Sequence, residues 1–144
     1  MSLEVEGAKA HDLPAALELL RRADLPENGV ADQFGNYFVV RDDVRLVGLG
    51  GLEVHGSDGL LRSVVVDPQY RGEGVGRRLL EFAVALARKM ELAGVYLLTT
   101  TAHEYFLERG FADCPRDEAP AGIRDAWEFK TGCPQKAAFM KLAL

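Results

Sequence analysis

Residues 71–77 read Arg-Gly-Glu-Gly-Val-Gly-Arg, a glycine-rich segment between arginines that suits the binding of a phosphorylated ligand. An apolar β-branched run, Val64–Val66, precedes this segment and ends at Asp67-Pro68, and a helical apolar pattern follows it. A strand, a glycine loop and a helix N-terminus in this order present free backbone N–H groups and the positive end of the helix dipole to an anion. The sequence therefore predicts a phosphate-binding loop.

The spacing of the glycines excludes two common phosphate-binding motifs. The dinucleotide fingerprint requires glycines at offsets one, three and six, and counting from Gly72 places Arg77 at the third position. The P-loop motif requires Gly-Lys followed by Ser or Thr, and this tripeptide does not occur in the sequence. The pattern that remains is Arg71-x-x-Gly74-x-Gly76.

This pattern, joined to Val64–Pro68, resembles the acetyl-CoA signature of the GCN5-related N-acetyltransferases (GNAT superfamily). The resemblance implies acetyl-CoA as co-substrate, with the backbone of the strand on the pantetheine and thioester and the loop amides on the pyrophosphate. The cofactor-binding residues that it implies are Val64, Val65, Val66, Arg71, Gly72, Glu73, Gly74, Val75, Gly76 and Arg77.

A second block, residues 97–111, reads Leu-Leu-Thr-Thr-Thr-Ala-His-Glu-Tyr-Phe-Leu-Glu-Arg-Gly-Phe. It resembles the acetyltransferase domain of bacterial N-acetylglutamate synthases. Together with the tail over residues 115–134, it also resembles the small acetyltransferases of arsenic-resistance operons. The resemblance implies an N-acetyltransferase that acts on the amine of a small amino-acid-like molecule by direct attack in a ternary complex. Two alternatives stay open: a non-catalytic acyl-CoA sensor, and an acetyltransferase of protein N-termini or lysines.

The sequence indicates the residues that would transfer protons less clearly than the residues that would bind acetyl-CoA. Many relatives have a glutamate base at the position of Leu60 and a tyrosine acid at the position of Phe106, and this chain has neither. Tyr105 lies one residue before Phe106, and one helical step rotates a side chain by about 100°. We therefore do not expect Tyr105 to reach the same point. Glu53 and His55, on the neighbouring predicted strand, are the other candidates and would act through water.

Two arginines are candidates for binding an acceptor carboxylate, because a guanidinium pairs with a carboxylate bidentately. Strand alternation predicts that Arg62 faces the same side of the sheet as Val64 and Val66. A structural ion pair is the alternative role for Arg62. Arg124 is the second candidate, in a tail that is expected to cover the acceptor site.

Composition favours a cytoplasmic enzyme. The 144 residues, 48% hydrophobic and 27% charged, fit one domain over 1–144. No apolar run approaches the roughly 20 residues of a membrane span, and no signal peptide is evident. A net charge of −5 argues against nucleic acid as a partner. Cys114 and Cys133 are interpreted as inert thiols, and the histidines lack the spacing of metal ligands, so no metal is predicted. The predicted partner is a small-molecule amine acceptor, and a homodimer is left open.

Hydrophobic periodicity predicts a mixed α/β sheet with helices on both faces, in the order β-α-α-β-β-β-α-β-α-β-β. This order matches the GNAT fold, in which the strand before the loop splays away from its parallel neighbour. The clearest helix runs from Val75 to Met90 and is expected to end at Gly94, and another is expected to be capped by Asp12. Strands are predicted over 3–7, 37–40, 44–54, 60–66, 95–98 and 137–142, and the other helices over 12–22, 30–34 and 102–109.

Overall fold

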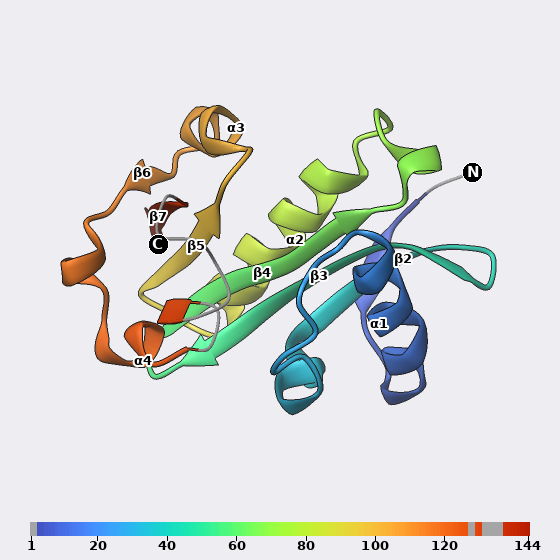
Figure 1. Cartoon of the computed structure of the whole chain (residues 1–144), viewed down its shortest axis with the longest axis horizontal. Coiled ribbons are helices and arrows are strands. Elements are labelled where there is room, and N and C mark those ends of the chain that lie inside the picture. Colours follow the sequence, from blue (N-terminus) through green and yellow to red (C-terminus); the bar gives the residue numbers. More distant parts are fainter. Residues whose placement is uncertain (1–2, 127–128, 131–136) are drawn as a thin grey trace.

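The computed structural model describes residues 3–126, 129–130 and 137–144. Within these ranges seven strands form one sheet in the order β1-β2-β3-β4-β5-β7-β6 (Figure 1). Neighbouring strands pair antiparallel, except β4 and β5, which pair parallel. The predicted mixed α/β sheet is confirmed.

The elements follow the predicted order with small shifts. The strands are β1 (Val5–Gly7), β2 (Tyr37–Asp42), β3 (Arg45–His55), β4 (Asp58–Val66), β5 (Gly94–Thr99), β6 (Ala112–Asp113) and β7 (Ala138–Ala143). The helices are α1 (Leu13–Arg22), α2 (Val75–Lys89), α3 (His103–Glu108) and α4 (Ala121–Arg124), with short 3-10 helices η1 (Ala10–Asp12), η2 (Ala31–Asn36), η3 (Pro68–Tyr70) and η4 (Arg116–Glu118). None of these helices is long and apolar enough to cross a membrane.

The predicted end of α2 is wrong, and one short helix of the tail was not predicted. Helix α2 ends at Lys89 rather than at Gly94, because Glu91 takes a left-handed conformation (φ 59°) and Gly94 already begins β5. The four-residue helix α4 was missed, since one turn is too short to show a hydrophobic period.

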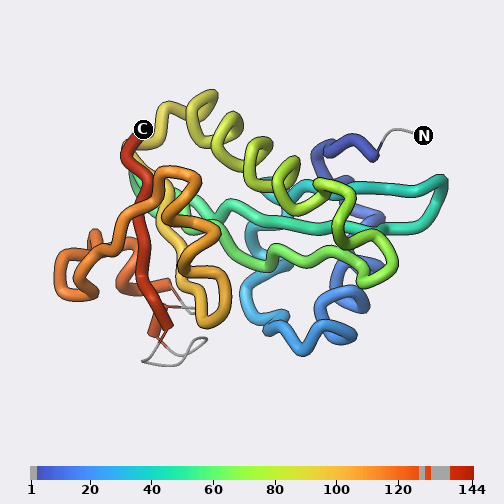
Figure 2. Tube along the Cα trace, turned by 90° about the horizontal axis from the view of Figure 1, so that it is seen from above, coloured from blue at the N-terminus to red at the C-terminus, as the bar shows by residue number. Residues whose placement is uncertain are grey.

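Helices cover both faces of the sheet, as Figure 2 shows with α2 on one side and α1 on the other. The α2 layer has buried residues at helical spacing, which pack on inward-facing residues of β2, β3 and β4. The α1 layer packs on the opposite residues of the same strands. The buried helical residues are Val75, Leu79, Leu80, Ala83 and Ala87 in α2, and Ala16, Leu19 and Leu20 in α1.

Strand β4 carries a β-bulge that decides which way its side chains point. Gly51 pairs with Arg62 and Leu49 pairs with Val65, so β4 has one residue more than β3 between these pairs. Within the bulge Ser63 has a φ of 60°, which is uncommon for a residue other than glycine.

The bulge reverses the alternation that the sequence predicted for β4. Val65 packs in the α1 layer and Val66 against the α2 layer. Arg62 bonds to carbonyl groups between α1 and η2, so it lies on the α1 side. The expectation that Arg62 shares a face with Val66 is therefore wrong, because one extra residue shifts the two-residue period.

Glycines in β3 make room for aromatic rings of β2. A Cβ atom at Gly51 would overlap the ring of Tyr37, its cross-strand partner. The Tyr37 hydroxyl in turn hydrogen-bonds to Ser63 Oγ at 3.1 Å, so the space over Gly51 lets this ring reach the bulge.

We expect Gly51→Ala to lower the free energy of unfolding by about 1–3 kcal/mol, because the added methyl group overpacks a buried ring. Gly35→Ala is the matched control, since a Cβ there meets nothing within 4 Å. Urea unfolding of both variants measures the difference. Equal losses of stability would contradict the packing argument.

Asp12 stands at the N-cap of α1, but its buried carboxylate pairs with Arg41 of β2 instead of capping the helix. The two carboxylate oxygens accept hydrogen bonds from Arg41 Nη1 and Nη2, both at 2.7 Å. The bonds from Arg41 lower the pKa of Asp12 to about 2. The pair therefore ties the start of α1 to the sheet.

Because this folded-state pKa is depressed, the ionised Asp12 stabilises the fold above about pH 4, and the stabilisation disappears as the pH falls through about 2. We expect Asp12→Asn to lower the free energy of unfolding at pH 7 by about 1–2 kcal/mol. The difference from the wild type should shrink between pH 4 and pH 2 in denaturant titrations. A difference that stays constant over this range would show that the charge is not the cause.

Candidate active site

A groove of about 1340 Å³ opens where β4 and β5 separate. Their parallel pairing extends only from Asp58–Gly94 to Leu60–Tyr96. Beyond the last pair the two strands diverge (Figure 1). Residues 64–66 and 97–99 line the groove from these strands. The edge of β4 that faces β5 is thus left to a ligand that can add alongside it as an extended strand does.

The predicted phosphate loop forms one end of this groove, and all of residues 71–77 line it. Gly72 and Gly74 adopt left-handed conformations (φ 84° and 80°), which are open to glycine at little cost. Gly74 is also the N-cap of α2, and a glycine has no side chain that could cap this helix end. The first N–H groups of a 15-residue helix therefore face an anion site together with the positive end of the helix dipole.

The arginines near the loop differ in whether they can add positive charge to the groove. Arg71 and Arg77 are exposed and line the groove. Arg78, the next residue in the chain, donates from Nη1 to the carbonyl of Leu3 at 2.9 Å and does not line the groove.

The loop is anchored to the tip of the β2–β3 hairpin, a contact that sequence reasoning missed. Asp67 is buried, and its carboxylate accepts bonds from Arg45 Nη2 (2.8 Å) and from the backbone N–H of Gln69 (2.9 Å). The Tyr70 hydroxyl donates to Asp42, and this bond raises the pKa of Tyr70. The only local signal was Asp67 before Pro68, which is typical of a capped turn.

The α1 side of the groove is walled by residues 23–26, which follow α1, and by Arg62 and Ser63 of β4. Sequence reasoning named Arg62 here but missed 23–26, because nothing in their composition indicates that they reach β4. The groove therefore has walls from both faces of the sheet.

The structure brings Arg62, Glu53 and His55 together as one chain of contacts. Glu53 Oε2 accepts a bond from Arg62 Nη1 at 2.9 Å, and Glu53 Oε1 lies 3.0 Å from His55 Nε2. Glu53 and Arg62 are both buried, and the His55 side chain is 21% exposed. Of the three, Arg62 alone is among the residues that line the groove.

Tyr105 and Phe106 of α3 both line the groove from the β5 side. Their rings meet edge to face with centroids 5.3 Å apart. Tyr105 therefore lies at the groove beside Phe106, although the two positions differ by one helical step. The guanidinium of Arg109, a further lining residue, lies 3.6 Å from the centroid of the Tyr105 ring.

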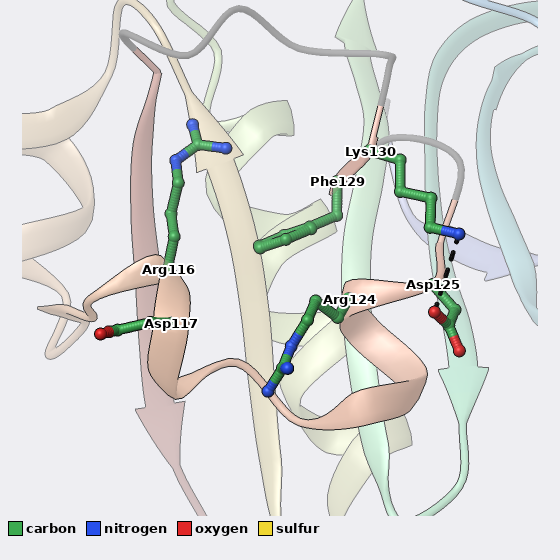
Figure 3. A pocket seen from close by; sticks show the side chains of 6 residues that line it. All are labelled: Arg116, Asp117, Arg124, Asp125, Phe129 and Lys130. Carbon is green, nitrogen blue, oxygen red and sulfur yellow. Dashed lines mark ion pairs between the residues drawn. The ribbon is translucent and has the colours of Figure 1, made fainter.

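Arg124 lies elsewhere, at a separate pocket of about 430 Å³ (Figure 3). Its Nη2 donates to the carbonyl of Ala119 at 2.8 Å. The other residues around this pocket are Arg116, Asp117, Asp125, Phe129 and Lys130, and Lys130 is paired with Asp125 at 3.7 Å. Arg124 and Arg62 thus belong to different cavities.

Neither Cys114 nor any of the three histidines is among the residues that line the groove. Burial raises the pKa of the Cys114 thiol, whereas Cys133 lies outside the described residues. Over the described ranges, no three His, Cys, Asp or Glu side chains are grouped so that they could hold a metal ion.

A splayed parallel strand pair, an uncapped helix N-terminus and a glycine loop define an acyl-CoA type of site on an open α/β sheet. A comparison with protein families gives the same class: residues 33–113 match the model "Acetyltransferase (GNAT) domain". The chain belongs to this family.

Several proteins that are similar to this chain are named amino-acid acetyltransferases. The chain is 30% identical over 134 residues to an amino-acid acetyltransferase from Azotobacter vinelandii, covering 85% of this chain and 31% of that protein. It superposes on N-acetylglutamate synthase from Neisseria gonorrhoeae, solved with coenzyme A and N-acetyl-glutamate, with a TM-score of 0.86 and 22% identity over 100% of this chain and 35% of that one. A Mycobacterium tuberculosis protein solved with CoA gives a TM-score of 0.83 at 25% identity, covering 97% of this chain and 98% of that one.

The chain spans less than a third of the first curated relatives that it matches, between 22% and 31% of their length. The similarity therefore concerns one domain of those longer proteins.

Proposed function

We propose that this domain is an acetyl-CoA-dependent N-acetyltransferase that acts on the amine of a small amino-acid-like acceptor. The observation that carries the proposal is the groove between the diverging strands, with residues 71–77 at one end. Family membership and the similarity to amino-acid acetyltransferases support the donor and the acceptor class. A cytoplasmic location belongs to the same proposal.

Acetyl-CoA binding follows from the chemistry of the groove walls. The loop amides and the α2 N-terminus hold the pyrophosphate, with Arg71 and Arg77 adding charge. The backbone of Val64, Val65 and Val66 bonds to the pantetheine arm as an added strand would. This arrangement directs the thioester toward the end of the groove where β4 and β5 meet.

The reaction is attack of a neutral amine on the thioester carbonyl. A C–N bond forms, the C–S bond breaks, the amine loses a proton and the coenzyme A thiolate gains one. Tyr105 is the candidate proton donor, since it lines the groove and Phe106 carries no proton to give. Solvent in the groove accepts the amine proton, because Glu53 and His55 do not line it.

Turnover should appear as coenzyme A release when amino acids and their analogues are supplied with acetyl-CoA. A thiol reagent measures the release, with a reaction lacking acceptor as the blank. Tight acetyl-CoA binding without release for any small amine would favour the sensor alternative. Turnover with peptides but not with amino acids would favour protein acetylation.

Gly74→Val should weaken acetyl-CoA binding by about tenfold or more, because a β-branched residue is strained at φ 80° and crowds the anion site. Gly56→Val is the matched control: Gly56 also has a positive φ (65°) with nothing near its Cβ position, but lies in the β3–β4 turn outside the groove. Calorimetric titration with acetyl-CoA compares the two variants. Equal affinities would refute the role of the loop.

A further inference from the structure

The guanidinium of Arg62 is bonded to three separate parts of the chain. Nη1 donates to Glu53 Oε2 of β3 (2.9 Å) and to the carbonyl of Asn28 (2.6 Å). Nη2 donates to the carbonyl of Pro26 (3.3 Å), and Nε to Ser63 Oγ (3.2 Å). The side chain is 1% exposed. With four partners among the residues that the structure describes and almost no exposure, Arg62 does not offer a two-pronged fork to a carboxylate in the groove.

The partners of Arg62 belong to the wall of the groove. Pro26 is itself a lining residue, and 23–30 joins α1 to η2 without being part of a helix or strand. Gly29 passes directly over the ion pair, since a Cβ there would lie 3.5 Å from both Arg62 Nη1 and Glu53 Oε2. The Arg62–Glu53 pair therefore supports this irregular segment from beneath.

The same pair also supports the bulge. Ser63, whose hydroxyl accepts from Arg62 Nε, shares a second hydrogen bond with Tyr37. The next residue, Val64, is 36% exposed and lines the groove. A shift of the guanidinium would thus move the segment 23–30 and the bulged part of β4 together.

We propose that Arg62 and Glu53 are positioning residues that hold the α1 side of the groove, where the acceptor would bind, and that Arg62 does not bind the acceptor carboxylate directly. Glu53 supplies the countercharge that lets Arg62 stay buried, because an unpaired buried charge is strongly unfavourable. His55 contacts the second carboxylate oxygen of Glu53 and so fixes its orientation from the solvent side. This inference rests on the proposed function only for its kinetic test.

Arg62→Gln and Glu53→Gln separate positioning from direct binding. If the pair positions the wall, each variant should raise the KM for the acceptor on the order of tenfold to a hundredfold. The acetyl-CoA dissociation constant should rise much less, because the loop end of the groove is held by separate contacts of Asp67. The increase should be the same for an amino acid and for its carboxamide, which lacks the carboxylate. Arg88→Gln, an exposed arginine of α2 outside the groove, is the control.

A loss restricted to the carboxylate-bearing acceptor in Arg62→Gln, with Glu53→Gln near wild type, would overturn the proposal and make Arg62 a carboxylate ligand. Unchanged kinetics in both variants would also overturn it. Glu53→Gln keeps the shape of the side chain and can still form a neutral hydrogen bond. It therefore tests the proposal even if Arg62→Gln does not fold.

Hydrogen exchange tests the same inference without any turnover. In Glu53→Gln the amides of 23–30 should exchange faster than in the wild type, whereas those of 71–77 should not change. No change in 23–30 would contradict the supporting role. If the wild type acetylates no amine, the proposed function fails, but this exchange result still decides the role of the pair.

Discussion

The divergence of β4 from β5 is the constraint on which the rest of the site depends. Two parallel strands that stayed paired would satisfy each other's backbone groups and leave no room for a ligand. Here the ladder stops at Leu60–Tyr96, and a bulge at Ser63 follows three residues later on β4. Because bulges bend the strand that carries them and increase its twist, the backbone of β4 turns away and a groove opens through the sheet.

Polar contacts with the rest of the protein hold the two ends of this groove in place. At the phosphate end, Asp67 and Tyr70 fix the loop to the tip of the β2–β3 hairpin through Arg45 and Asp42. At the other end, the Arg62–Glu53 pair supports the segment after α1. The exposed backbone of the glycine loop is thereby left for a ligand, together with Arg71 and Arg77, while Arg78 is engaged with the protein.

Much of the donor site could be predicted from consecutive residues. The glycine spacing in 71–77 distinguished an acyl-CoA loop from dinucleotide and P-loop motifs, and the family match agrees with it. Helix α2 was visible because its apolar residues repeat at helical spacing. Short elements were not located, since two to four residues carry no period: the predicted order includes a strand before the last one but gives no residues for β6, and α4 was missed.

The α1 side of the groove could not be derived in this way. The sequence alone indicates the fold class, the phosphate loop and the strand before it, because each depends on residues that are neighbours in the chain. The direction of Arg62 and its contacts with Glu53, Pro26 and Asn28 depend on residues 9 to 36 positions away. A single extra residue in β4 sets these contacts. The residue in the left-handed conformation there is Ser63 and not a glycine, so the sequence does not indicate the bulge. Only the packed sheet, whose register must satisfy both faces at once, determines where the bulge falls and which way Arg62 points.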